Sequence, residues 1–389
     1  MAKDYYEESL RLHELYSGKL AVVSKVNLDD TDDLSTAYTP GVAQPCREIV
    51  KNPDSAYRYT FKGNAIAVVS DGSATLGLGN TGGLASLPVM EGKCVLFKRF
   101  ANVDAFPIVL ATQDADEIVE TVARISPTFG GINLEDISAP RCFEIESRLR
   151  DELGIPVFHD DQHGTAIVVS AAVINAFKLL GKPLGEVKAV VNGAGAAGNA
   201  ITKMLAKAGV KDIIVCDSKG IIHSGRMAEL SKDKIELLEL TNKENKKGRL
   251  KTAIKGRDLF IGVSAPKVVT KEMVGTMVPD PVVFALSNPE PEIRPKLAKE
   301  GGAKIVATGR SDFPNQINNV LAFPGVFRGA LDAEAKDITD GMKIAAAYAL
   351  AGLIQDDELT AEKIIPRVFD EGVVQAVAGA VAKAWKENA

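Results

Sequence analysis

Short apolar runs alternate with helical segments through the second half of the chain. Five of these runs are apolar on both faces and have the length of buried strands: VKAVVN (187–192), DIIVCD (212–217), DLFIGV (258–263), PVVFAL (281–286) and AKIVAT, which starts at Ala303. Such runs, separated by helices, predict a parallel sheet that is covered on both faces. The lysine-rich stretch SKDKIELLELTNKENKKGRLK predicts a solvated helix and loop, and the tail VVQAVAGAVAKAWKENA predicts a packing helix.

The first half of the chain has a different pattern. It opens with a charged amphipathic stretch that predicts a helix, and it becomes rich in turns around STAYTPGVAQPC. A β-branched run in NAIAVVSDGSATLGLGNTGG leads into five glycines within residues 72–83, which predicts a buried strand, a loop and a helix. We therefore expect two α/β domains. Residues 1–160 would form an N-terminal substrate and catalytic domain, and 161–389 a C-terminal Rossmann-type domain with a doubly wound parallel sheet, linked by the helix GTAIVVSAAVINAFKLLG.

Composition and charge restrict the class of protein. The chain has 389 residues, 46% hydrophobic and 25% charged, which is typical of globular domains. A net charge of −5 argues against a nucleic-acid surface. The four cysteines show no CxxC spacing, which fits a reducing compartment. The N-terminus lacks the apolar core of a signal peptide, and no apolar run is long enough to span a bilayer. We therefore expect a cytoplasmic protein without membrane contact.

A glycine-rich turn follows the first predicted strand of the second half. VNGAGAAGNA has the GxGxxG spacing and stands between that strand and a helical segment. The first glycine permits the tight turn, the second lets a pyrophosphate approach the backbone, and the third lets helix and strand pack closely. A glycine-rich turn without a ligand is the alternative. The predicted cofactor-binding residues of this loop are Gly193, Ala194, Gly195, Ala196, Ala197 and Gly198.

Asp217 ends the next predicted strand, about 20 residues beyond Gly198, where an acid binds the ribose 2′-hydroxyl of NAD. Because a carboxylate repels a 2′-phosphate, Asp217 favours NAD over NADP. Lys211 and Lys219 lie close by in the sequence, however, and could neutralise such a phosphate. NAD is therefore the expected cofactor, with NADP as the other option.

Two acidic pairs stand beside apolar runs: Glu135 and Asp136 in NLEDISAP, and Asp160 and Asp161 in VFHDDQHGTA. A buried carboxylate needs a partner, which can be a cation on the protein, a bound metal, or water if the stretch lies at the surface. Carboxylate oxygens suit Mg²⁺ or Mn²⁺ better than zinc. The two histidines of VFHDDQHGTA leave a histidine–carboxylate site for zinc or iron as a variant, but no third suitably spaced histidine supports it.

These motifs occur together in one known family. STAYTPGVA, VSDGSATLGLGNTGG, MEGKCVLFK, NLEDIS, HDDQHGTA, VNGAGAAGNA, LSNPEPE and NNVLAFPGVFRGAL stand in the order found in malic enzymes. From about residue 20 to 350 the chain resembles the short bacterial or archaeal form of this family. The resemblance implies oxidative decarboxylation of (S)-malate to pyruvate and CO₂, reduction of NAD(P)⁺, a divalent metal (Mg²⁺ or Mn²⁺) and a homodimer.

The resemblance also implies roles for individual residues. Glu135, Asp136 and Asp161 would hold the metal, which makes the C2 hydroxyl of malate easier to deprotonate. Lys93 in MEGKCVLFK would take that proton as hydride leaves, and Asp160 would pair with Lys93 and orient it. Because a close carboxylate raises the pKa of a lysine, desolvation and the metal charge must outweigh Asp160 for Lys93 to act as a base.

The remaining site residues also come from the resemblance. Tyr38 in AYTPG would protonate the enolpyruvate carbon after decarboxylation. Asn288 in LSNPE and Asn319 in NNVLAFPG match asparagines that hold the substrate carboxylate, with Asn318 as the alternative neighbour, and Asn288 also counts among the cofactor-binding residues. Amides at such turns can instead serve only to cap helices.

The chain departs from the larger family members at Ala74. Those members carry, at this place in the glycine-rich loop, an arginine that clamps malate. The substrate carboxylate would then rely on the metal, the asparagines and the backbone amides of Gly79–Gly83 acting as an anion nest. We therefore expect weaker malate binding than an arginine clamp gives.

Three other functions fit the same motifs. A malolactic-type enzyme would keep NAD bound and release lactate from malate. An oxaloacetate decarboxylase with a vestigial nucleotide site would act without a nucleotide. A nucleotide-sensing protein that has lost catalysis would only bind. The motifs do not separate the first of these from a malic enzyme.

Overall fold

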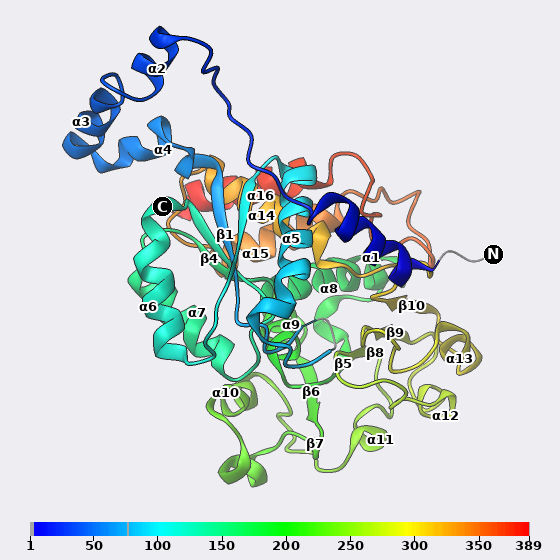
Figure 1. Cartoon of the computed structure of the whole chain (residues 1–389). Helices are drawn as coiled ribbons and strands as arrows, with labels where there is room; N and C mark the ends of the chain where they lie inside the picture. Colours follow the sequence, from blue (N-terminus) through cyan, green and yellow to red (C-terminus); the bar gives the residue numbers. More distant parts are fainter. Residues whose placement is uncertain (1–3, 76–77, 389) are drawn as a thin grey trace.

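The computed structural model describes residues 4–75 and 78–388 and contains two separate sheets (Figure 1). The first sheet has the strand order β2-β1-β3-β4, and the second has the order β10-β9-β8-β5-β6-β7. All neighbouring strands are parallel except β6 and β7. The strands are β1 (Ala65–Ser70), β2 (Asp104–Val109), β3 (Gly131–Leu134), β4 (Val157–His159), β5 (Lys188–Asn192), β6 (Asp212–Asp217), β7 (Gly220–Ile221), β8 (Leu259–Gly262), β9 (Val282–Ala285) and β10 (Ile305–Thr308).

Helices cover these sheets and form an arm at the N-terminal end. The α-helices are α1 (Tyr5–Tyr16), α2 (Thr31–Ala37), α3 (Ala43–Lys51), α4 (Ala56–Tyr59), α5 (Gly82–Ala101), α6 (Ala115–Ile125), α7 (Arg141–Glu152), α8 (Asp160–Leu179), α9 (Ala196–Lys207), α10 (Lys232–Leu240), α11 (Leu250–Ala253), α12 (Lys271–Val274), α13 (Pro295–Glu300), α14 (Phe323–Asp332), α15 (Asp340–Ala351) and α16 (Val373–Asn388). Short 3₁₀ turns are η1 (Pro53–Ser55), η2 (Phe61–Asn64), η3 (Ser126–Thr128), η4 (Leu184–Glu186), η5 (Ser224–Glu229) and η6 (Asn319–Leu321).

The second sheet confirms the predicted α/β pattern. The five predicted strands are β5, β6, β8, β9 and β10, each within two residues of its predicted bounds. Val190 packs in one core and its neighbours Ala189 and Val191 in another, so β5 is buried on both faces by helices. The antiparallel β7 was not predicted, because a strand of two residues leaves no apolar run in the sequence.

The first sheet is likewise covered on both faces. Ile66 and Val68 of β1 share a core with residues of α5, whereas Ala67 and Val69 pack with residues of α6 and α7. This arrangement confirms the predicted buried strand, loop and helix between residues 65 and 101. Strands β2, β3 and β4 complete the sheet, and their carboxyl ends lie at one edge because all four strands are parallel.

Helix α8 runs between the two sheets and starts four residues earlier than predicted. Its first turn contains Asp160 and Asp161, whose charges are favourable at a helix N-terminus. The last helices return to the first sheet, since the ring of Phe327 on α14 lies 5.4 Å from that of Phe97 on α5. The core therefore continues across both sheets, and the proposed division near residue 160 stays a prediction.

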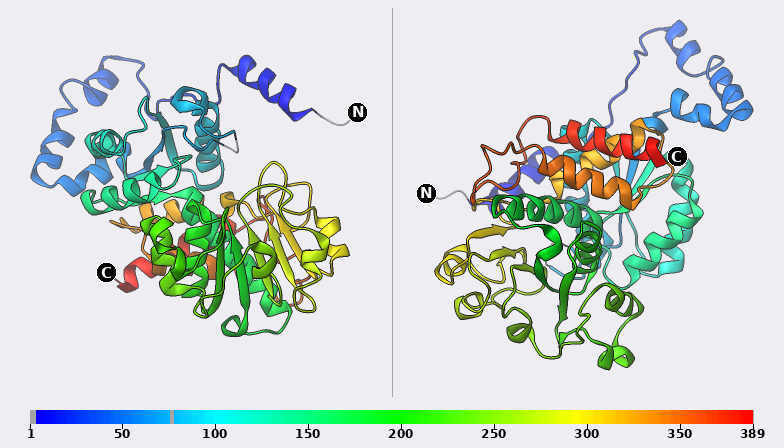
Figure 2. Two further views of the ribbon diagram at one scale, coloured as in Figure 1. Left: turned by 90° about the horizontal axis from the view of Figure 1, so that it is seen from below. Right: turned by 180° about the vertical axis from the view of Figure 1, so that it is seen from behind.

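The segment with α2, α3 and α4 projects from the body of the molecule (Figures 1 and 2). These three helices have no buried residue. Their surface nevertheless carries large apolar side chains at Leu34, Val42, Val50 and Tyr59. Within residues 4–75 and 78–388, no helix has the length and hydropathy needed to cross a membrane.

Candidate active site

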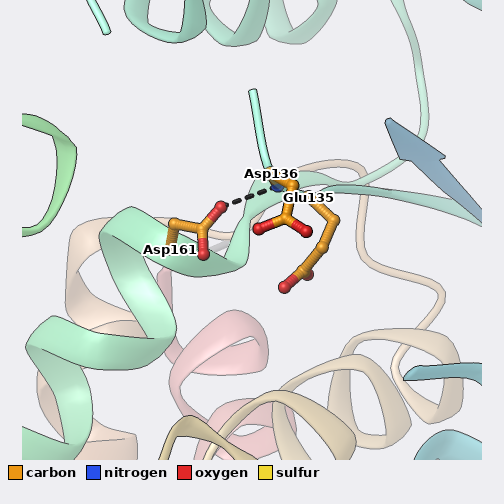
Figure 3. Close-up of side chains that lie close together, drawn as sticks. All are labelled: Glu135, Asp136 and Asp161. Atoms are coloured by element: carbon orange, nitrogen blue, oxygen red, sulfur yellow. Dashed lines mark hydrogen bonds between the residues drawn. The ribbon is translucent and has the colours of Figure 1, made fainter. Parts of the chain in front are cut away.

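The two acidic pairs converge at the carboxyl ends of β3 and β4. Glu135 and Asp136 directly follow β3, and Asp161 lies in the first turn of α8, which directly follows β4. One carboxylate oxygen from each of these three residues lies within 4.8 Å of the other two (Figure 3). The structure thus brings together the three residues that the sequence suggested as metal ligands, here called the acidic cluster.

Backbone and amide contacts hold the acidic cluster in place. The backbone N–H of Asp136 donates to Oδ2 of Asp161 at 2.8 Å, and Nδ2 of Asn133 donates to Oε2 of Glu135 at 2.9 Å. Asp136 adopts a positive φ of 55°, and its carbonyl oxygen accepts from the N–H of Ala74 at 2.9 Å. The glycine-rich loop therefore contacts the cluster through its backbone at Ala74.

Lys93 reaches the acidic cluster from α5. Its Nζ lies 2.6 Å from Oδ2 of Asp160 and 2.9 Å from Oε1 of Glu135, and the side chain is only 7% exposed. The same Nζ lies 4.0 Å from the centre of the Phe323 ring, which supplies a cation–π contact. Nδ2 of Asn319 donates to the same Asp160 oxygen that binds Lys93. Lys93, Asp160 and Asn319, which the sequence placed in one site, are therefore in direct contact.

The charges of this site do not balance within the protein. Burial raises the pKa of Asp160 to about 6, although Lys93 opposes the shift. Burial also raises the pKa of Glu135 and of Asp161, and repulsion from neighbouring acids adds to the effect. Burial alone would lower the pKa of Lys93, but Asp160 and Glu135 outweigh it and hold that pKa above its usual value.

A divalent cation fits this donor set. The ammonium group of Lys93 contacts two carboxylates, those of Asp160 and Glu135. Glu135 also belongs to the acidic cluster, whose three carboxylates offer hard oxygen atoms close to one point. In the part of the chain that the structure describes, the acidic cluster is the group of His, Cys, Asp and Glu side chains with the spacing of a metal site. Glu135, Asp136 and Asp161 therefore have the right chemistry for Mg²⁺ or Mn²⁺ and lack the soft ligands that zinc prefers.

The two histidines beside the acidic pair differ in their contacts. Nε2 of the buried His159 lies 3.4 Å from Oδ2 of Asp161, whereas His163 turns away from the acidic cluster. Nε2 of His163 lies 2.8 Å from Oε1 of Glu146, a buried residue of α7. Glu146 also accepts the backbone N–H of His159 and the side-chain amide of Gln162. These bonds fix the start of α8 and with it the position of Asp161. Glu146 was missed from the sequence, although it interrupts the apolar stripe of α7 and so could have been noticed as a buried acid.

The glycine-rich turn adopts the geometry that its sequence suggested. Gly193 has a φ of 118°, and a Cβ there would lie 2.4 Å from the carbonyl oxygen of Val263. A Cβ on Gly198 would lie 1.7 Å from the carbonyl oxygen of Gly193, so helix α9 and strand β5 pack without room for a side chain. Gly195, immediately before α9, has open space on its Cβ side. The turn and the helix N-terminus together form a cradle for an anionic group.

A cavity of about 780 Å³ lies along this cradle. Its walls include Asn192, Gly193, Ala194, Gly195, Asp217 and Ser264. Asp217 therefore faces the same space as the glycine-rich turn, as expected for a residue at the adenosine ribose. Lys219 and Lys211 do not take the place suggested for them. Lys219 pairs with Glu229 at 2.9 Å, and Lys211 precedes β6, whereas Asp217 ends that strand.

Three of the predicted residues stand apart from these contacts. Tyr38 follows α2 in the projecting segment and is 68% exposed, so one copy of the chain does not bring it to Lys93. The side chain of Asn318 accepts the backbone N–H of Val320 at 3.0 Å and so caps η6, the alternative role considered for such amides. Asn288 is exposed in the loop after β9. The anion nest suggested at Gly79–Gly83 stays a prediction.

Comparison with known proteins agrees with this geometry. The N-terminal domain of malic enzymes matches residues 17–150, and the NAD-binding domain of malic enzymes matches residues 162–386. The chain belongs to the malic enzyme family. The predicted family, the α/β fold with a Rossmann-like domain and the NAD(P)-dependent malic enzyme activity are thereby confirmed.

Individual relatives cover nearly the whole chain. A bifunctional malic/malolactic enzyme of Bacillus subtilis is 58% identical over 98% of this chain and 93% of its own length. An NAD-dependent malic enzyme of Geobacillus stearothermophilus is 55% identical over 94% of this chain and 76% of its own length. The crystal structure of an NAD-dependent malic enzyme from Thermotoga maritima superposes with a TM-score of 0.93 at 49% identity, over 96% of this chain and 98% of that one.

Proposed function

We propose that this malic enzyme oxidises and decarboxylates (S)-malate at the acidic cluster, with Glu135, Asp136 and Asp161 as ligands of Mg²⁺ or Mn²⁺. The position of Lys93 supports this most directly, because its buried Nζ contacts both Asp160 and Glu135. Two further carboxylates, those of Asp136 and Asp161, lie close to Glu135. A divalent cation bound there supplies a Lewis acid for the C2 oxygen of malate.

Lys93 is the proposed acceptor of the C2 hydroxyl proton. Only neutral lysine accepts a proton, and burial favours that form while Asp160 and Glu135 oppose it. A divalent cation held by Glu135 would offset the charge of that carboxylate, and Asp160 would then be the main anion that keeps Lys93 protonated. Asp160 then orients Nζ of Lys93, and Asn319 donates to the same Asp160 oxygen and holds it in place.

Tyr38 is the proposed acid that protonates the enolpyruvate carbon, and we propose that it acts in the partner subunit of a homodimer. Its exposure and its place in the projecting segment support this arrangement. The apolar side chains of Leu34, Val42 and Val50 on the same segment would gain a partner surface in a dimer. An interface of this kind pairs equivalent surfaces on the two copies.

Mixed dimers test this arrangement directly. Lys93→Ala and Tyr38→Phe each inactivate a homodimer under this proposal. Mixing the two variants restores one complete site per heterodimer if Tyr38 acts on the partner, giving about a quarter of the wild-type rate after random exchange. If Tyr38 acts in its own subunit, the mixture stays inactive. The mass of the assembly by light scattering reports the dimer independently.

The cofactor is proposed to be NAD⁺, because Asp217 lines the cavity beside the glycine-rich turn, where an acid binds the ribose hydroxyl; NADP⁺ is the second option. We also propose a cytoplasmic location, supported by four cysteines that are all free, three of them buried. Absorbance at 340 nm with malate and Mn²⁺, run separately with NAD⁺ and NADP⁺, tests the reaction. If neither nucleotide gave an increase at 340 nm and malate were not consumed, the proposed reaction would be contradicted.

A malolactic reaction is the second candidate. It is supported by the Bacillus subtilis relative, whose name includes that activity. Such a reaction consumes malate without net NADH and yields lactate, so lactate analysis beside the 340 nm assay separates the two functions.

A further inference from the structure

Glu292 is a buried acid in the loop after β9 that has no part in the contacts described so far. Its side chain is fully buried, and within the described residues no basic side chain lies within ion-pair distance of it. Burial raises the pKa of Glu292, and hydrogen bonds from two backbone N–H groups offset this only in part. Because a buried apolar residue would cost less free energy than a buried acid without a cation, the groups that Glu292 binds explain its presence.

The two oxygens of Glu292 fasten two loops to each other. Oε1 accepts the backbone N–H of Ser264 at 2.9 Å, in the loop after β8, and Oε2 accepts the backbone N–H of Ser287 at 3.0 Å, in the loop after β9. Gly262 leaves the space for the carboxyl group, since a Cβ at Gly262 would lie 2.4 Å from Cδ of Glu292. Strands β8 and β9 are neighbours in the second sheet, so one side chain is long enough to join the loops that follow them.

One of these bonds leads to the dinucleotide cradle. The hydroxyl of Ser264 donates to Oε1 of Glu292 at 3.4 Å and accepts Nδ2 of Asn192 at 2.7 Å. Asn192 ends β5, directly before Gly193, and both Asn192 and Ser264 line the cavity of about 780 Å³. The carboxylate of Glu292 therefore holds one wall of the cavity in which a dinucleotide would lie.

The other bond leads to the proposed malate site. Ser287 directly precedes Asn288, the asparagine that is proposed to hold the substrate carboxylate. The bond from Ser287 to Glu292 fixes the backbone from which Asn288 projects. Hydride transfer requires the nicotinamide ring and C2 of malate at a defined separation and orientation. Glu292 joins the loop on the nucleotide side to the loop on the malate side.

We propose that Glu292 is a positioning residue for hydride transfer, which holds the wall of the dinucleotide cavity at a fixed place relative to Asn288. This inference rests on the proposed dinucleotide and malate sites. A carboxylate suits the task because each of its two oxygens accepts an N–H. An amide accepts through one atom only and presents N–H donors through the other, so it would oppose one of the two backbone N–H groups.

Glu292→Gln tests this role with little change of volume. Calorimetric titration of NAD⁺ without malate should show about tenfold weaker binding, the loss of one hydrogen bond to the cavity wall. Single-turnover stopped flow at 340 nm, with enzyme in excess over NAD⁺ and saturating malate and Mn²⁺, measures the rate constant of hydride transfer. We expect this rate constant to fall by roughly 10 to 100-fold, because a displacement of about 1 Å between reacting groups is enough.

Glu290→Gln is the matched control in the same loop. The carboxylate of Glu290 pairs with the exposed Arg294 at 3.1 Å and holds neither of the two serines. Its variant should therefore match the wild-type protein in both NAD⁺ affinity and rate constant.

The single-turnover rate constant separates positioning from a merely structural role. At saturating enzyme it does not depend on how many molecules are folded, so a loss of stability alone leaves it unchanged. An unchanged rate constant in Glu292→Gln would overturn the proposal, whether or not the melting temperature falls, since Glu292 would then only support the fold. If Glu292→Gln does not fold, Glu292→Asp decides by the same measurement, because its shorter side chain keeps the charge but does not reach both loops.

The wild-type protein separates this inference from the proposed function. If the wild-type protein formed no NADH from malate, the proposed reaction would be contradicted, and the NAD⁺ titrations would still test the tie between Glu292 and the cavity wall. Equal NAD⁺ affinity in the wild-type and Glu292→Gln proteins would then overturn that tie. Normal wild-type turnover with a normal rate constant in Glu292→Gln would contradict the role of Glu292 alone.

Discussion

In the dinucleotide cradle, the decisive contacts come from the backbone of one short stretch, Gly193 to Gly198. In the acidic cluster and the contacts of Lys93 beside it, they come from side chains on α5, the loop after β3, α8 and η6, which are far apart in the sequence. The cradle carries no charged side chain and is open at Gly195, whereas the acidic cluster is buried at Glu135 and Asp136, half-buried at Asp161, and in contact with the charge of Lys93. The cradle should therefore respond mainly to changes of shape, and the cluster mainly to changes of charge.

Lys93→Ala should give the largest effect and affect the cluster alone. Removing the proposed base should lower kcat by about 10³-fold, within the range for loss of a general base, while NAD⁺ affinity stays within a few fold of wild type. Steady-state rates at 340 nm and calorimetric titration of NAD⁺ measure the two effects. Lys98→Ala is the control, because Lys98 lies on the same helix and its side chain is 56% exposed. A Lys93→Ala enzyme within tenfold of the wild-type rate would remove Lys93 from the chemistry.

Asn133→Leu tests the support of the acidic cluster. It removes the amide that donates to Oε2 of Glu135 and should weaken Mn²⁺ binding by roughly 10 to 100-fold, as outer contacts of metal ligands do. Titration of Mn²⁺ into chelator-treated protein measures the affinity. Gln355→Leu, at an exposed amide, should leave it unchanged. Unaltered Mn²⁺ affinity in the Asn133 variant would show that Glu135 does not need this bond.

Two glycine variants test the response of the cradle to shape. Gly193→Ala places a methyl group against the carbonyl of Val263 at a positive φ and should destabilise the fold by about 1–3 kcal/mol. Gly195→Ala meets open space, so the melting temperature should hold while NAD⁺ affinity falls by about tenfold, because the methyl group occupies the approach of the pyrophosphate. Equal melting temperatures for the two variants would contradict the expectation that Gly193 is needed for the fold and Gly195 only for the approach of the nucleotide.

The smallest effect concerns pH. Because the folded pKa of Asp161 is raised to about 6, its carboxylate carries a proton at pH 5 that Mn²⁺ must displace. The gain in unfolding free energy on adding Mn²⁺ should therefore rise by roughly 1–2 kcal/mol between pH 5 and 7.5. Without metal, the contribution of Asp161 to the free energy of unfolding changes with pH in the opposite direction. Because its pKa is higher in the folded than in the unfolded state, the contribution is fully present below the unfolded pKa of about 4 and is lost as pH rises through 6. Thermal melts with and without Mn²⁺ measure both trends, and a gain independent of pH would contradict proton competition.

The sequence identified much of this molecule because several signals were local. The strands of the second sheet follow from apolar runs, and the turn at Gly193 follows from glycine spacing next to such a run. The order of the motifs pointed to the family. The start of α8 was placed four residues too late, at the beginning of the apolar run, although the acids before that run are favourable in the first turn of a helix.

Other features depend on contacts that no local pattern records. Arg226 reaches Asp217 only because β7 folds back on β6. Of the two lysines considered from the sequence, Lys219 pairs with Glu229, and Lys211 lies before β6, at the other end of the strand from Asp217. Glu146 became a support of α8 because α7 packs beside it. Tyr38 was placed in the site by resemblance, yet a single copy of the chain holds it on an exposed segment.

The sequence by itself determined the second sheet, the glycine turn and the set of acids, because each depends on the spacing of residues along a few turns of chain. Only the tertiary structure decided which charges face one another. Lys93 lies between two acids more than twenty residues apart, and Asp217 is neutralised from across a hairpin. Electrostatic energy depends on distances in space and on burial, and neither quantity is fixed until the elements have packed.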